Sequence, residues 1–212
     1  MKNRIFLALI ITISLMWVLH NISNTFIVDP LATKILKVKN PFNTSVWFID
    51  LRIHVISSCI ALVSGAFNLS KWSFKKKKNH KINGWIYSVS VIISALSSIY
   101  LIYYATGGIM TSFSFSVSTT IWLYSLFISI VEIKNSNLIK HKEWMIRCYA
   151  LTLSNITLHL VVNILSKLLN IDYIHAWTFS SWLSWTLNLL IAQIVILNIR
   201  KKQFSQMKPY SF

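Results

Sequence analysis

Acidic residues are scarce in this chain of 212 residues, where five Asp and Glu accompany twenty-one Lys and Arg, giving a formal net charge of +16. Charged residues make up only 12% of the chain, well below the usual share of a soluble domain, about 25%. The four glycines and three prolines exclude collagen-like repeats and Pro/Gly-rich linkers. A hydrophobic content of 55% excludes intrinsic disorder. The apolar residues are concentrated in long runs, as in integral membrane proteins.

Cysteine is rarer still, with only Cys59 and Cys148. Two cysteines without a CxxC pair form no metal framework, and their positions at different depths in two spans predict buried thiols rather than a disulfide. The sequence contains no HExxH, P-loop, GxSxG or dinucleotide-binding motif. An intramembrane enzyme acting on a lipid would need a nucleophile and a base, and no convincing set is present.

Six segments are long enough to cross a bilayer core of about 30 Å, which needs about 20 apolar residues at about 1.5 Å each. They predict an all-α integral membrane protein, a six-helix transmembrane bundle forming a single domain over residues 1–212. The predicted spans are 4–20, 46–69, 83–105, 109–133, 144–169 and 176–199. The first could alternatively be a signal peptide, but no small-x-small cleavage site follows it, which favours an uncleaved span.

Lysine and arginine are distributed unequally between the two sides of the predicted bundle. They gather before the first span, in the loops after the second and fourth spans, and in the tail, whereas the loop 21–45 holds only Lys34, Lys37 and Lys39. The positive-inside rule therefore predicts that both termini are cytoplasmic. Because topology accounts for most of the net charge, we expect anionic lipid headgroups as partners at the cytoplasmic face and no nucleic-acid binding.

Polar residues recur at helical spacing within the spans and predict which faces turn inward, because polar groups are costly in contact with lipid. Small and hydroxyl residues on such stripes also allow helices to approach closely. The stripes are Asp50, His54, Ser57, Ala61, Gly65 and Asn68 in the second span, Ser90, Ser94 and Ser97 in the third, Cys148, Thr152, Asn155, His159, Asn163 and Ser166 in the fifth, and Ser181, Ser184 and Asn188 in the sixth.

Two histidines on these stripes are predicted at nearly the same depth. His54 is eight residues from the outer end of its span and His159 is ten from the outer end of its own, a difference of about 3 Å. Asp50 lies one turn before His54 and is placed to accept its second ring proton. These residues are the candidate ligand set of a b-type haem held between the second and fifth spans. His80 and His141, at the inner surface, would supply the second layer of a two-haem arrangement.

Each of these residues also has a structural interpretation. An imidazole in the outer third of a membrane can simply hydrogen-bond a neighbouring hydroxyl, and histidines among interfacial lysines are ordinary. Arg147, one turn after Glu143, is predicted to form an i,i+4 pair that anchors the fifth span. His-Lys recurs shortly before a Trp at His80 and at His141, which would make spans two–three and four–five parallel repeats.

Several short stretches form a set between about residues 50 and 160. They are His54 with Ala61-Leu62-Val63-Ser64-Gly65, His80-Lys81 with Gly84 and Tyr87, Gly107-Gly108, and His141-Lys142-Glu143-Trp144-Met145-Ile146-Arg147 with Tyr149-Ala150-Leu151. This set resembles an uncharacterised prokaryotic multi-span membrane protein family, domain of unknown function 2306. The family pattern often has Arg where this chain has Lys81, Lys142 and His159. The resemblance implies a bacterial inner-membrane protein. It favours His54, His80, His141 and Arg147 as the candidate site residues over the His54–His159 pair.

Two functions from different classes are consistent with these features. The paired histidines favour a membrane electron-transfer protein that binds haem b and exchanges electrons with a quinone or another redox partner. The alternative is a non-catalytic membrane protein, either an accessory or sensor subunit or a small-solute permease.

Overall fold

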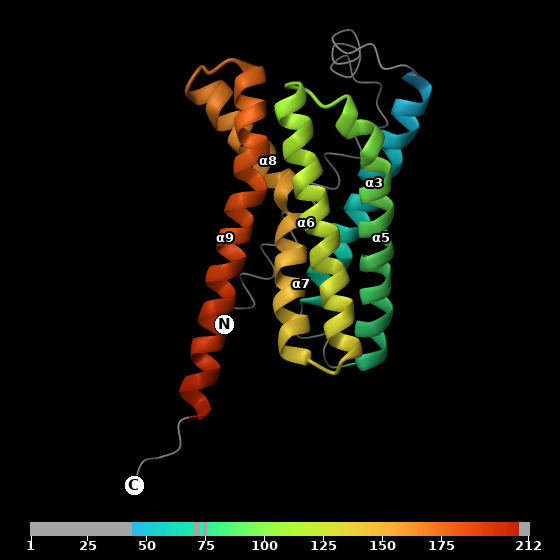
Figure 1. Cartoon of the computed structure of the whole chain (residues 1–212), viewed down its shortest axis with the longest axis vertical. Helices are drawn as coiled ribbons and strands as arrows, with labels where there is room; N and C mark the ends of the chain where they lie inside the picture. The colour runs from blue at the N-terminus through green and yellow to red at the C-terminus, as the bar shows by residue number, and fades with distance from the viewer. Residues whose placement is uncertain (1–43, 70–72, 74–75, 208–212) are drawn as a thin grey trace.

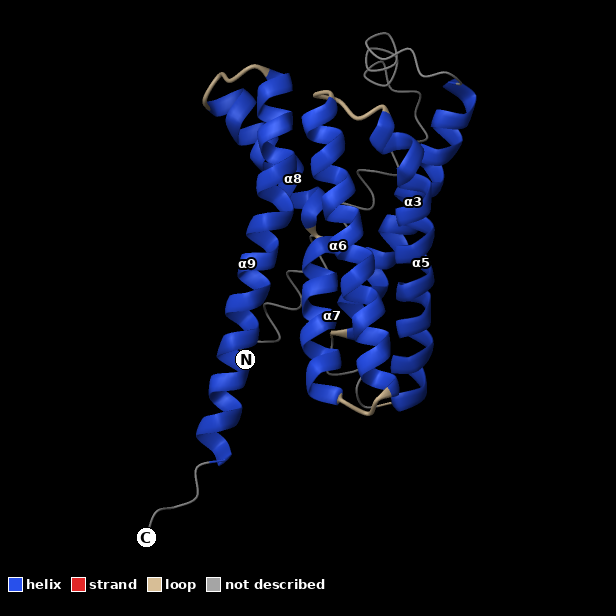
Figure 2. Cartoon of the chain, in the orientation of Figure 1, coloured by secondary structure: helices blue, strands red, loops and turns tan. Residues whose placement is uncertain are grey.

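The computed structural model describes residues 44–69, 73 and 76–207, so the predicted first span, 4–20, lies outside the described residues. The part that is described contains helices and no strand (Figure 2). Five of its helical segments are long and apolar enough to cross a membrane. The described part therefore has a long apolar helix at each of five predicted spans, and it confirms the all-helical fold class.

The spans form a bundle in which sequence neighbours pack as antiparallel pairs (Figure 1). α3 packs chiefly against α5, α6 packs against α7, and α9 covers α7 and α8. In order along the chain the elements are α3 (Thr44–Asn68), α5 (Lys77–Tyr103), α6 (Ile109–Lys134), α7 (Leu138–Thr152), α8 (Ser154–Asn163), the π-helix η1 (Ile164–Leu168) and α9 (Tyr173–Met207). α7, α8 and η1 together make the fifth predicted span.

Three helices begin or end in charged sequence outside the predicted apolar segments. α5 begins at Lys77 rather than residue 83, α7 begins at Leu138 rather than 144, and α9 continues to Met207 beyond 199. Lysine and glutamine are good helix formers, and long basic side chains reach water from the ends of a span. Hydropathy marks the length of the hydrocarbon crossing, whereas the hydrogen-bonded helix continues into the headgroup region.

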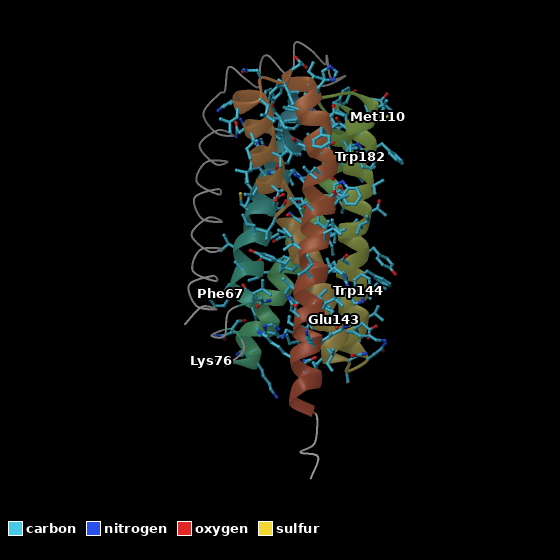
Figure 3. The ribbon with its side chains drawn as sticks, turned by 90° about the vertical axis from the view of Figure 1, so that its left-hand side faces the viewer. Phe67, Lys76, Met110, Glu143, Trp144 and Trp182 are labelled. Carbon is cyan, nitrogen blue, oxygen red and sulfur yellow. The ribbon has the colours of Figure 1, made fainter. Side chains whose placement is uncertain are left out.

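The turn between α5 and α6 contains two consecutive glycines. Gly107 and Gly108 have φ of +90° and +73°, a backbone region that residues with a Cβ rarely adopt. At the opposite end, the Asn137 side chain caps α7 by accepting a hydrogen bond from the Lys140 amide at 3.2 Å. Figure 3 places Met110 at the first of these ends and Lys76 and Glu143 towards the second.

The inward faces predicted for α3 and α9 are confirmed. On α3, Ser57 and Ala61 are 5% and 0% exposed, whereas Ile49 on the opposite face is 55% exposed. On α9 the stripe that includes Ser184 and Asn188 is buried in the same way. The fifth-span stripe is less regular, because Cys148 is fully buried while Asn155 and Asn163 are exposed at their positions in α8. The departure begins where this span is interrupted.

Candidate functional site

The fifth span is interrupted near its middle. α7 ends at Thr152 and α8 begins at Ser154, with Leu153 between them. The Leu153 amide donates to the Tyr149 and Ala150 carbonyls at 3.1 and 3.2 Å, and its carbonyl accepts from the amides of Ile156 and Thr157 at 3.1 and 3.3 Å. Bonds of i→i+3 type are thus added to the i→i+4 ladder, and the interruption is a one-residue distortion of a continuous span. No proline or glycine is present at this point. The interruption must therefore be stabilised by contacts with neighbouring helices.

Asn188 of α9 supplies those contacts. Its Nδ2 donates to the Ala150 carbonyl at 3.0 Å and reaches the Ser154 hydroxyl at 3.4 Å. Its Oδ1 accepts from the Thr157 hydroxyl at 3.0 Å. Asn188 thus contacts the residues on both sides of Leu153, and a polar side chain from a neighbouring helix is a known way to satisfy backbone groups at a break inside a membrane. We call these residues the Asn188 clamp.

His54 lies in the seam between α3 and α5. Its Nδ1 is 2.9 Å from the Ser94 carbonyl and 3.2 Å from the Ser94 hydroxyl. A carbonyl oxygen only accepts, so the neutral ring carries its proton on Nδ1 and keeps a lone pair on Nε2. The prediction that Asp50 accepts the ring proton is wrong, because the carbonyl of α5 takes that place. Ser58 completes the group, with its hydroxyl 2.6 Å from that of Ser94.

A small cavity of about 30 Å³ lies between α3 and the interrupted span. Such a volume holds one or two water molecules. Its walls are His54, Val55, Ser58, Cys59 and Leu62 of α3, and Thr152, Asn155 and Ile156 beside the interruption. The lining carries no charged side chain, and its polar groups are an imidazole, two hydroxyls, a thiol and an amide. Because Nδ1 of His54 is bonded to Ser94, Nε2 is the ring nitrogen that is available to hydrogen-bond a molecule in this cavity.

Thr152 connects the cavity to a second polar cluster at the centre of the bundle. Its hydroxyl lies 2.8 Å from the Tyr87 hydroxyl and accepts from Trp122 Nε1 at 3.1 Å. Tyr87 also donates to Cys148 Sγ at 3.1 Å. Tyr87 and Cys148 are both fully buried, and Cys148 and Cys59 are free thiols as the sequence predicts. The cluster joins α5, α6 and α7 through side chains of four different kinds.

Replacing Tyr87 with phenylalanine tests this cluster. We expect Y87F to lower the free energy of unfolding by about 1 kcal/mol, since side-chain hydrogen bonds inside membrane bundles contribute from a few tenths to about 1.7 kcal/mol each. An unfolding titration with dodecyl sulfate in mixed micelles measures the difference. Y124F is the matched control because the Tyr124 ring is exposed. Equal stability of the two variants would contradict a structural role for the Tyr87 hydroxyl.

The inner histidines lie together at the Lys-rich end of the bundle. His141 Nδ1 is 2.7 Å from the Ser129 carbonyl at the end of α6, and His80 Nδ1 is 3.2 Å from the Ser73 hydroxyl. The two imidazoles are within electrostatic reach of each other. His80 and His141 thus lie at the same end of the bundle, and each ring is bonded to a different segment of the chain.

The outer histidines take part in different seams. The His54 ring is bonded to Ser94 of α5, whereas the His159 ring packs edge-on against Trp177 of α9, with centroids 5.6 Å apart. Cofactor pockets measure about 300–1,000 Å³, and the cavity beside His54 measures about 30 Å³. A porphyrin between His54 and His159 does not fit this arrangement, because the two rings contact different helices and the cavity is too small. The described residues also contain no cluster of three or more His, Cys, Asp or Glu.

Arg147 and Glu143 do not form the predicted i,i+4 pair. Glu143 instead receives both arms of the Arg200 guanidinium, with Nε and Nη2 at 2.6 and 2.5 Å from its two oxygens. Arg147 donates to Gln193 at 2.9 Å and lies over the Trp144 ring at 4.7 Å. Both arginines thus hold α7 to α9. Glu143 thus pairs with Arg200 of the facing helix instead of Arg147 of its own helix. The reason is that a guanidinium binds a carboxylate most strongly when two of its nitrogen donors meet both oxygens.

Residues 51–196 match the family described as "Predicted membrane protein (DUF2306)". The chain belongs to this family. The matched region runs from α3 to α9 and contains the cavity, the Tyr87 cluster and the Asn188 clamp. No curated protein and no solved structure matches the chain. The DUF2306 match confirms the resemblance found in the sequence, together with a multi-span membrane location.

Sequence reasoning placed His54, Thr152, Asn155 and Asn188 on inward stripes but did not group them into one site in this DUF2306 protein. The missing information was the interruption at Leu153, which brings Thr152 and Asn155 to the cavity wall. The only sequence signal was the number of hydrogen-bonding side chains around position 153, where Thr152, Ser154 and Asn155 occur within an apolar run.

Proposed function

We propose that the protein is a permease for a small uncharged polar solute in a bacterial inner membrane, and that the solute binds in the His54 cavity. The observation that supports this most strongly is the coincidence of the cavity with an interrupted membrane helix. Transporters commonly bind substrate near the middle of the membrane, beside helices that are discontinuous there. An ionisable residue at that depth is also a functional-site candidate by default.

The position of the cavity agrees with this proposal. Ten residues separate Thr44 from His54 in α3, so His54 lies about 15 Å from the outer end of a helix of about 37 Å. Fourteen residues separate Leu138 from Thr152 in α7, a distance of about 21 Å from the inner end. Both walls of the cavity are thus close to the middle of the bilayer.

The lining supports the class of solute. A neutral imidazole accepts a hydrogen bond at Nε2, and the hydroxyls of Ser58 and Thr152 both donate and accept. With no charged group in the lining, an ion would lose its hydration without compensation. The volume and the donors fit a solute of the size of water or ammonia.

Flux into proteoliposomes tests the proposal. We expect vesicles loaded with a pH-sensitive dye to alkalinise faster than protein-free vesicles after an ammonium chloride jump, or to shrink faster after an osmotic jump that reports water. Loss of one hydrogen bond of about 1.4 kcal/mol at the site corresponds to a change of about tenfold. H54Q should therefore slow the flux by about that factor, and H175Q, at an exposed position on α9, should not.

Three results would overturn the permease. Rates equal to those of protein-free vesicles for both probes would exclude transport of these solutes. Equal effects of H54Q and H175Q would separate transport from the cavity. Acidification after a pH step without ammonium, in vesicles made permeable to potassium, would indicate proton conduction in place of a neutral solute.

The second candidate is the haem-binding electron carrier predicted from the sequence, with a quinone as redox partner. One observation favours it: His54 and His141 each direct Nδ1 at a backbone carbonyl, the arrangement usual for a histidine that ligates through Nε2. A haem would require α3 and α8 to separate. A reduced-minus-oxidised spectrum, after expression with added haem, decides the matter, because a Soret band that H54Q removes would favour this candidate over the permease.

A further inference from the structure

A second cavity lies apart from the His54 site, at the Lys-rich end of the seam between α7 and α9. Its volume is about 170 Å³. Isoleucines from both helices form most of its walls, and charged side chains form its rim. Its lining includes Ile139, Ile146, Ile196 and Ile199 in the walls, and Lys142 and Glu143 at the rim. We call this cavity the α7/α9 crevice.

The charges around the crevice do not balance. Glu143 is already bonded by both arms of Arg200, and Arg147 is bonded to the uncharged Gln193. Lys142 has no ion pair within the part of the chain that the structure describes. One carboxylate therefore stands beside three cations, and the rim has an excess of positive charge. Half of the Arg200 side chain remains exposed, at 48%, so it can accept a second anionic partner.

The depth of the crevice matches the boundary between headgroups and acyl chains. α9 has 35 residues and is about 52 Å long, so it extends well beyond a hydrocarbon core of about 30 Å. Glu143 lies beside this extended part of α9, towards the end that also carries Lys76 (Figure 3). Ile146 and Ile196 lie one helical turn deeper in the bundle than Lys142 and Arg200, where an acyl chain would contact them.

We propose that the α7/α9 crevice binds one anionic phospholipid. Lys142 and the exposed side of Arg200 bind its phosphate, and the upper part of one acyl chain packs along the isoleucines. Basic pockets between membrane helices on the cytoplasmic side commonly bind anionic headgroups. Such a lipid would join α7 to α9 across the same seam that the Glu143–Arg200 pair joins, so its binding should stabilise the folded protein.

Thermal unfolding of the purified full chain in detergent tests the site. Phosphatidylglycerol is compared with phosphatidylcholine carrying the same acyl chains. We expect phosphatidylglycerol to raise Tm by several degrees more than phosphatidylcholine, and K142Q to lose at least half of that difference. K81Q is the matched control, because Lys81 is an exposed lysine in the first turns of α5 at the same membrane face and does not line the crevice.

A second variant tests the apolar part without changing any charge. Ile139 is 58% exposed, so I139W is compatible with folding and places a ring in the crevice. We expect I139W to abolish the difference between the two lipids. Equal stabilisation by both lipids would overturn the proposal. Equal losses in K142Q and K81Q would also overturn it, since they would indicate diffuse attraction of anionic lipid by the whole basic face.

Discussion

Replacing Gly65 with alanine should destabilise the protein by about 1–3 kcal/mol, the usual cost of overpacking a well-packed interior. A Cβ at this position would lie 2.5 Å from two ring carbons of Tyr149 and 2.9 Å from a ring carbon of Tyr87. Both rings are buried, and both are held by their hydroxyls, Tyr149 by the Leu62 carbonyl at 3.2 Å and Tyr87 by the central cluster. Neither ring can move away without losing a hydrogen bond.

G84A is the matched control for G65A. Gly84 is also helical, but its added Cβ would meet only the terminal amide of Asn68 at 3.3 Å, a contact that a shift of a few tenths of an ångström at the end of this side chain relieves. Alanine also favours the helix by about 1 kcal/mol over glycine, so G84A should be neutral or slightly stabilising. Dodecyl sulfate unfolding measures both variants. Equal stabilities of G65A and G84A would show that α3 separates from α5 and α7 without cost at this crossing.

The inward faces of the helices were predictable because they depend on local periodicity alone. On α3, the steps of three and four residues between His54, Ser57, Ala61 and Gly65 define one face whatever its neighbour is. The apolar face of Ile49, by the same reasoning, had to contact lipid. Span positions followed from hydrophobic length.

Partners across the seams were not predictable, because they depend on which helices are adjacent and how each is rotated. Glu143 had a cation one turn away at Arg147, and nothing in the sequence indicated that Arg200, 57 residues further along the chain, would reach it instead. The same reason explains His54, which bonds the Ser94 carbonyl. A backbone acceptor leaves no residue-type signal, since every residue carries a carbonyl.

The positions of His54 and His159 along their spans gave similar depths for the two residues. They did not indicate which neighbouring helix each ring would face. His54 and His159 were predicted on inward stripes at similar depths, and each does face another helix. The interruption at Leu153 separates α8 from α7, so the stripe of α7 does not continue unchanged into α8. His159 accordingly packs on Trp177, and the residues that reach the His54 cavity are Thr152 and Asn155.

N188L should lower the free energy of unfolding by about 2 kcal/mol and should also reduce flux through the proposed permease. Leucine has a similar volume but leaves the Thr157 hydroxyl and the Ala150 carbonyl without their present partner. Asn188 is 8% exposed, so lipid and water cannot replace it freely. Three hydrogen bonds at about 0.6 kcal/mol each, the average inside membrane bundles, give the expected size of the effect.

The flux effect arises because the Asn188 clamp holds the interruption that forms one wall of the cavity. N198L is the matched control, since Asn198 is exposed on the same helix and makes the same change in composition. A double-mutant cycle with T157V isolates the Asn188–Thr157 bond of 3.0 Å, with an expected coupling of about 0.6 kcal/mol. If N188L unfolds like N198L yet transports at the wild-type rate, the break at Leu153 persists without Asn188. The helix interruption would then be a property of α7 and α8 themselves, and the solute site would have to be assigned without the clamp.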